Sequence, residues 1–113
     1  MKNFNFSYDG ENDDLFIYAE GKKSAGAVEV GDFVFDFDEE ENLVAIQIMN
    51  ASEVLSKLVY RVISLTNIKA IQAEVIKFRN MNAIDIHVQF AGREERIPIV
   101  IPRITRSSPI IEL

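Results

Sequence analysis

The chain has 113 residues, of which 48% are hydrophobic and 27% charged, and its formal net charge is −6. This length fits one domain with a core of its own, and the composition is globular rather than disordered. The absence of cysteine excludes disulfides, thiolate metal sites and thiol catalysis. We therefore expect a single domain over residues 1–113.

We expect no secretory signal peptide at the N-terminus. Its first ten residues, MKNFNFSYDG, lack the apolar segment of a secretory signal peptide. No apolar run in the chain approaches the roughly 20 residues that span a bilayer. We expect a soluble cytoplasmic protein without a membrane partner.

The charge is unevenly distributed. Residues 1–56 carry 13 acidic and three basic residues, a net −10, whereas residues 57–113 carry nine basic and five acidic residues, a net +4. The acidic half would repel a phosphate backbone, so a nucleic-acid partner is not expected. The opposite charges favour association between copies of the chain, or with a basic protein.

Alternation of apolar and polar residues predicts five strands in the first half. Two of them form a hairpin around a polar turn at residues 9–13. The predicted strands are 4–8, 15–19, 27–30, 33–37 and 43–49. Phe33, Phe35 and Phe37 lie at strand spacing and predict a core face. The last strand is apolar on both faces apart from Gln47, so we expect it to be central and covered on both sides.

The periodicity then changes from strand to helix. Apolar residues recur at helical spacing from Val54 to Ile63, which predicts a helix at about 51–64. Asn50 followed by Glu53 predicts a capping box at its start.

Three more strands are predicted, at 68–79, 84–90 and 97–101. Pro98 and Pro102 favour an edge position for the last strand. The tail over residues 103–113 ends in apolar residues, which are expected to dock on this domain or on a neighbour. The fold class is therefore α+β, an antiparallel β-meander or sheet of about eight short strands with one helix packed on it.

The acidic run from Asp36 to Glu41, in the stretch FDFDEEEN, invites a comparison with a calcium loop. An EF-hand needs glycine where Glu41 stands and a bidentate glutamate where Gln47 stands, and it needs flanking helices. The run is therefore interpreted as a hairpin turn, whose charges keep the strand ends soluble.

The sequence predicts no catalytic residue and no cofactor. If the two acidic turns met and a cation bound there, its ligands would be Asp9, Asp13, Asp36 and Asp38. The lone histidine, His87, lies on the polar side of its strand and is expected to be exposed.

Two motifs resemble a known family. Residues 8–17, YDGENDDLFI, are similar to Y-D-x-x-x-D-x-L-Y-I. Residues 36–38 followed by 43–52, LVAIQIMNAS, are similar to D-x-D and then L-V-G-I-E-I-L-D-A-S. Over about residues 4–56 the chain therefore resembles the small prokaryotic proteins grouped as domain of unknown function 2283.

The departures from these patterns include Phe16, Ala45, Gln47 and Asn50. The loss of two acidic positions argues against an acidic catalytic set. Residues 57–113, the helix end and the C-terminal strands, extend beyond the usual short domain. The resemblance implies no established activity. The association of some members with small toxin-like proteins implies an antitoxin-like role.

The sequence thus favours a non-enzymatic protein-interaction module that associates with itself, as a homodimer. The first alternative is an antitoxin-like binder of a basic partner protein. The second is a metal-dependent hydrolase that uses the Asp and Glu residues of the hairpin turns.

Overall fold

The computed structural model describes residues 1–59, 63–77 and 82–101. These residues form eight strands, one α-helix and one short 3-10 helix. The elements are β1 (Lys2–Asp9), β2 (Asp14–Tyr18), β3 (Gly26–Val30), β4 (Phe33–Phe37), β5 (Leu43–Ile48), α1 (Ala51–Val59), η1 (Leu65–Asn67), β6 (Ile68–Lys77), β7 (Asn82–Phe90) and β8 (Arg93–Ile101). The fold is thus broadly α+β and mostly β.

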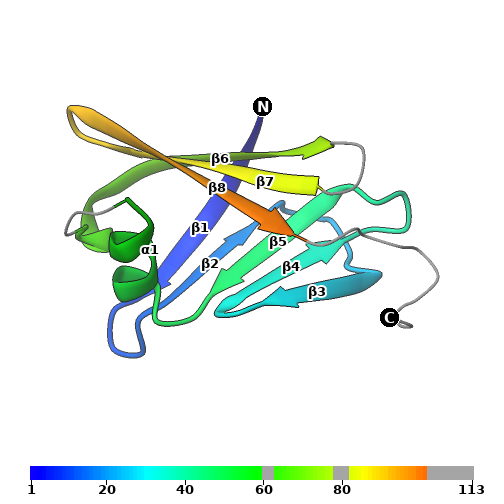
Figure 1. The fold of residues 1–113 in the computed structure, drawn as a ribbon, viewed down its shortest axis with the longest axis horizontal. Coiled ribbons are helices and arrows are strands. Elements are labelled where there is room, and N and C mark those ends of the chain that lie inside the picture. The colour runs from blue at the N-terminus through cyan, green and yellow to red at the C-terminus, as the bar shows by residue number, and fades with distance from the viewer. Residues whose placement is uncertain (60–62, 78–81, 102–113) are drawn as a thin grey trace.

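The strand order is β3-β4-β5-β2-β1-β6-β7-β8, with antiparallel pairing throughout. It is not a simple meander, because β5 returns to pair with β2, and β6 returns to pair with β1. The β1–β2 hairpin therefore lies at the centre, with one three-stranded meander on each side (Figure 1).

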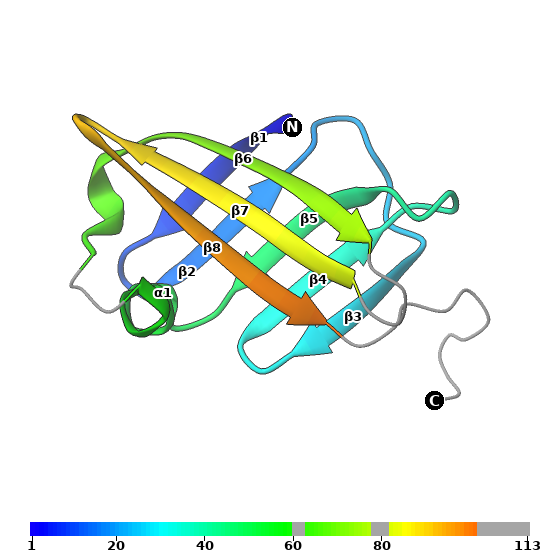
Figure 2. The same ribbon diagram turned by 45° about the horizontal axis from the view of Figure 1, so that its top comes forward.

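The sheet curls into two layers that share β1. Residues 5–9 of β1 pair with β2, whereas residues 2–4 pair with β6. We call β1–β5 the N-terminal layer and β6–β8 the C-terminal layer. Figure 2 shows the strands of the C-terminal layer crossing over those of the N-terminal layer, with α1 at one end.

The core lies between the two layers. Phe33, Phe35 and Phe37 point inward, as predicted, and Phe35 is completely buried. They belong to one buried cluster with Ile84 and Ile86 of β7. Because this cluster draws on both layers, neither layer buries its apolar face alone.

Strand β5 has its predicted position but not its predicted cover. It lies between β4 and β2, which confirms that it is central. Its outward face carries Ala45, which is half-buried, and Gln47, which is exposed. The expectation of cover on both sides is therefore wrong, because an antiparallel sheet can leave one face in water.

Helix α1 is shorter than predicted. It ends at Val59, and Ile63 and Ser64 are not helical, while residues 60–62 lie outside the described part. Buried Ala51 and Leu55 hold its inner face. The β-branched residues towards residue 63 are weak helix formers, which fits the early end.

Strand β8 is an edge strand, as the prolines predicted, because it pairs only with β7. Pro98 lies opposite Asp85 in this pairing. Pro102 and the tail over residues 103–113 lie outside the described residues. Over the described ranges, no helix is long and apolar enough to cross a membrane.

Candidate functional site

The turn between β1 and β2 is organised by the carboxylate of Asp9. It accepts hydrogen bonds from the backbone N–H groups of Glu11, at 3.0 Å, and Asn12, at 3.3 Å, and from the Asn12 amide, at 2.8 Å. These donors, led by the Asn12 side chain, hold the pKa of Asp9 below its ordinary value. The arrangement is an Asx turn, in which a side chain stabilises its own loop.

Asp13 joins this turn to the start of α1. Its carboxylate accepts a hydrogen bond from the Tyr8 hydroxyl at 2.6 Å, from the Ser52 backbone N–H at 3.0 Å and from the Ser52 hydroxyl at 2.9 Å. Its carbonyl accepts the Ala51 N–H at 2.8 Å. Asp13 therefore supplies the cap that the sequence assigned to Asn50.

The predicted capping box is wrong for a conformational reason. Asn50 has a φ of +52°, in the left-handed region, whereas a capping residue adopts extended backbone. Glu53 instead lies 3.4 Å from Lys57 along the helix. Asp13 also has a positive φ, of +57°, which aspartate tolerates better than most residues.

The Tyr8–Asp13–Ser52 contact shifts the pKa values of both titratable partners. Burial raises the pKa of Asp13, but hydrogen bonds from Tyr8 and Ser52 outweigh this and lower it overall. The pKa of Tyr8 is raised, mainly because its hydroxyl donates to the Asp13 carboxylate. Asp13 is thus an ionised structural cap whose bonding positions are used within the chain.

The turn between β4 and β5 is stabilised in the same way as the first turn, by an aspartate that accepts hydrogen bonds from its own loop. Asp38 accepts the N–H groups of Glu40 and Asn42, both at 2.9 Å, and the Asn42 amide at 3.2 Å. The Asn42 backbone bond is the main reason why the pKa of Asp38 is lowered. The acidic run that resembled a calcium loop is a hairpin turn built on this carboxylate.

The two acidic turns do not meet. Leu15 at the start of β2 pairs with Ile48 at the end of β5, and Tyr18 pairs with Ala45. This antiparallel register places Asp9 and Asp13 at one end of the N-terminal layer and Asp38 at the other. Asp36 lies on the outward face of β4, opposite Ala45. Among the residues that the structure describes, no three His, Asp or Glu side chains are arranged to hold a metal.

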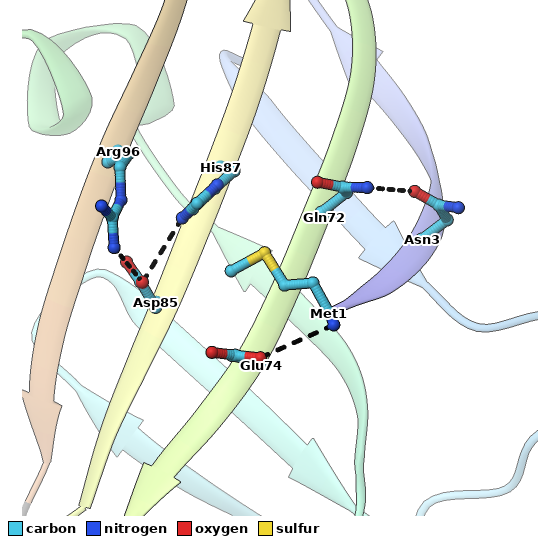
Figure 3. Close-up of polar contacts among 7 residues, drawn as sticks. All are labelled: Met1, Asn3, Gln72, Glu74, Asp85, His87 and Arg96. Atoms are coloured by element: carbon cyan, nitrogen blue, oxygen red, sulfur yellow. Dashed lines mark hydrogen bonds and ion pairs between the residues drawn. The ribbon is translucent and has the colours of Figure 1, made fainter.

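A second polar cluster lies on the outward face of the C-terminal layer (Figure 3). Asp85 of β7 is only 4% exposed, and its Oδ2 accepts a 2.8 Å hydrogen bond from the guanidinium of Arg96 on β8. His87 Nε2 lies 3.3 Å from the same oxygen, and His87 Nδ1 lies 3.0 Å from Glu94. The cluster therefore bridges β7 and β8 from side to side.

The contacts among Asp85, His87, Glu94 and Arg96 stabilise the pairing of β7 with β8, and we call these residues the β7–β8 polar cluster. Both ring nitrogens of His87 face carboxylates, so neither is directed at open space. Burial raises the pKa of Asp85, but the bonds from Arg96 and His87 lower it further than burial raises it. The expectation that His87 is exposed is wrong, since its side chain is only 15% exposed.

The outward face of the N-terminal layer carries a different feature, a stacked aromatic pair in which one ring is exposed and the other is half-buried. Phe16 is 44% exposed and stacks on Tyr18, with ring centroids 5.1 Å apart and ring planes 19° apart. A cleft of about 500 Å³ opens beside Tyr18, and its lining includes Asn5, Glu20 and Lys69 of β6. We call Phe16 and Tyr18 the aromatic pair.

The sequence analysis predicted neither the β7–β8 polar cluster nor the aromatic pair. The aromatic pair could have been predicted, because alternation in β2 places Leu15 and Ile17 inward and therefore Phe16 and Tyr18 outward. The contact of Asp85 could not be predicted in this way, because its partner Arg96 becomes a neighbour only through the β7–β8 pairing.

Comparison with known families confirms the resemblance. Residues 5–52 match the family described as "Protein of unknown function (DUF2283)". The match covers residues 5–9 of β1, all of β2–β5 and the first residues of α1, and it includes Tyr8, Asp13 and Ser52. The motif residues thus include those that join the β1–β2 turn to the helix.

Two curated relatives share this region. An uncharacterized protein of Methanocaldococcus jannaschii is 45% identical over 49 residues, which are 43% of this chain and 42% of that protein. A putative hypoxanthine phosphoribosyltransferase of Methanosarcina mazei is 34% identical over 47 residues, 42% of this chain and 38% of that protein. The matches thus span about two fifths of these relatives. No solved structure matches the chain.

Proposed function

We propose that this protein is a non-enzymatic interaction module, whose contact surface is the outward face of the N-terminal layer. The observation that carries the proposal is the aromatic pair, in which exposed Phe16 stacks on half-buried Tyr18, on a sheet face that no described element covers. Aromatic side chains dominate the binding energy of protein interfaces because they bury a large area and lose little rotamer freedom.

The non-enzymatic part of the proposal is supported by how the polar groups are used. Asp9, Asp13, Asp38 and Asp85 each accept hydrogen bonds from this chain's own residues. Such carboxylates stabilise turns, a cap and a sheet. A hydrolase built on both acidic turns is not favoured, because the register holds the turns at opposite ends of the layer.

The experiment is site-specific photo-crosslinking in the native host. A photoreactive phenylalanine analogue replaces Phe16 in one variant and Val100 in the other. Val100 is the matched control, since it is 58% exposed on the other layer. A defined adduct at position 16 and none at position 100 supports the proposal. No adduct at position 16 under conditions of normal expression refutes it.

Self-association as a homodimer is a second candidate, favoured by the C-terminal layer. Exposed Val100 and half-buried Ile76 lie in one outward apolar row, on either side of Ala83, which is buried. Strand addition at the β8 edge is less favourable, because Pro98 is compatible with the sheet only if its missing N–H faces the open edge. Pairing through the outward apolar row avoids this loss.

Light scattering after gel filtration tests the dimer. We expect dimeric wild-type protein and a monomeric Val100→Asp variant, whose carboxylate would be buried without a partner. A Phe16→Ser variant serves as the control and stays dimeric. Wild-type protein that remains monomeric at every concentration and salt level rejects this candidate.

A further inference from the structure

We propose that the partner at the aromatic pair is a basic protein segment, and that an arginine of this segment lies on Phe16 and Tyr18 and pairs with Asp36. This inference rests on the proposed function and specifies the chemistry of the partner. It is argued from the charges of the face, from the strand register and from the side chain that separates the aromatic pair from the carboxylate.

The outward strand positions of the N-terminal layer carry charge of one sign, while Lys69 of β6 lines the cleft beside Tyr18. These positions include four carboxylates and, within the described strands, no lysine or arginine. The carboxylates are Asp9, Asp14, Glu29 and Asp36. Lys22, in the loop before β3, acts electrostatically on Asp38 at the turn. The face therefore attracts cations and repels anions.

The register places two rows of side chains across this face. In one row Phe16 is followed by Gln47, Val34 and Glu29. In the parallel row Tyr18 is followed by Ala45 and then by Asp36. Because neighbouring strands lie about 4.8 Å apart, Asp36 is roughly 10 Å across the sheet from Tyr18.

Ala45 is the residue that leaves room for a ligand group. It is the smallest side chain in its stretch of the row and lies directly between Tyr18 and Asp36. A planar guanidinium stacked on the aromatic pair can extend over Ala45 and donate to the Asp36 carboxylate. Arginine combines stacking on rings with bidentate donation to carboxylates, which lysine does not.

The same charges decide against two other occupants. A second copy docked face to face would oppose carboxylates to carboxylates, which is unfavourable. A nucleic acid would bring its phosphates against the same groups. An arginine-containing protein segment neutralises the face and uses its aromatic surface.

The test uses a defined probe, a 12-residue peptide of alternating arginine and serine, titrated into the full chain by calorimetry and by NMR. Peptides with lysine or glutamate in place of arginine are compared at the same salt concentration. We expect the affinity to fall from the arginine to the lysine peptide and to vanish for the glutamate peptide. NMR shifts are expected at Phe16, Tyr18 and Asp36.

Variants separate the proposed site from general attraction of cations to an acidic protein. Phe16→Ser, Asp36→Asn and Ala45→Leu should each weaken the arginine peptide about tenfold, the loss of one stacking or charged contact. Glu39→Gln removes an equal charge from the exposed turn, and Val100→Ser removes an exposed apolar group from the other layer. Both control variants should bind the arginine peptide with an affinity within about twofold of wild type.

Equal losses in Asp36→Asn and Glu39→Gln, or shifts centred on residues 38–42, would overturn the inference. An adduct at position 16 with no binding of the arginine peptide would leave the proposed function standing and reject only the basic partner. Failure of both would reject the face altogether.

Discussion

The outward faces of the two layers differ in whether their carboxylates are matched by positive charges on the same face. On the C-terminal layer the buried carboxylate of Asp85 is matched by Arg96 and His87 on the same face. On the N-terminal layer the carboxylates of Asp14, Glu29 and Asp36 have no cation among the outward positions of the described strands. The first face satisfies its buried charge, whereas we propose that the second gains from an external cation. This difference is the reason for placing the proposed partner on the N-terminal layer.

The largest expected effect tests whether the two layers are one folding unit. Phe35→Ala and Ile86→Ala each remove a fully or almost fully buried side chain from the shared core. We expect losses of about 3–5 and 2–5 kcal/mol in the free energy of unfolding, respectively. Chemical denaturation should give one transition in each variant, by fluorescence and by circular dichroism. Two separate transitions would mean that the layers fold independently.

The next effect concerns the cap. Asp13→Ala removes the acceptor of Tyr8 and of the first turn of α1, so we expect a loss of about 2 kcal/mol in unfolding free energy. Asp14→Ala, one residue further along, is the control and should cost less than about 0.5 kcal/mol. Equal losses in urea denaturation would show that the turn tolerates either change and that Asp13 is no cap.

In the β7–β8 polar cluster, removing Arg96 should cost more stability than removing Asp85. Arg96→Met leaves the buried Asp85 carboxylate without its strongest donor, and we expect a loss of about 2 kcal/mol. Asp85→Val leaves Arg96, whose side chain is 66% exposed and can be solvated, and His87, which keeps its contact with Glu94, so the loss should stay below about 1 kcal/mol. Thermal unfolding measures both. The reverse order would show that the cluster does more than stabilise the sheet.

Acid should lower the free energy of unfolding by protonating Asp13 and Asp85. The folded-state pKa values of Asp13 and Asp85 lie below the ordinary value, so their stabilisation is complete above the unfolded pKa near 4 and is lost as the pH falls through the folded values. Unfolding free energy should therefore fall below about pH 4, and it should fall less steeply in Asp13→Ala than in wild type. An unchanged acid slope in the variant would contradict the assigned role of Asp13.

The smallest effect on stability is expected at the aromatic pair. Phe16→Ser should change the unfolding free energy by about 0.5 kcal/mol or less, because nearly half of this side chain is already in water. The contrast between this small effect and a large loss of partner binding is what identifies a binding surface. A loss of several kcal/mol would instead make Phe16 part of the structural core.

Much of the fold was accessible to sequence reasoning because period two is a local property. The alternation around Phe33, Phe35 and Phe37 predicted an inward face, and Pro98 predicted an edge strand, and both are confirmed. The return of β5 to β2 was not predicted, because pairing partners depend on long-range packing. The helix start was placed correctly, but the wrong residue was chosen as its cap.

Less of the candidate site could be predicted from the sequence, because several of its contacts join residues that are far apart along the chain. Asp9 and Asp38 are held by residues within four positions of themselves, so their turns were identified from sequence. Asp13 meets Ser52 across 39 positions, and Asp85 meets Arg96 across a hairpin. Whether the acidic turns meet depends on the register of β2 against β5, which no local pattern specifies.

The sequence by itself determined which side of each strand is apolar, where the turns fall and how unevenly the charge is distributed, because these follow from spacing and residue type. Only the tertiary structure decided that the acidic turns lie at opposite ends, that Asp13 caps α1 and that the aromatic pair shares a sheet face with the carboxylates of Asp14, Glu29 and Asp36. Those outcomes depend on which strands pair and in which register, and packing of the shared core selects these across the whole chain.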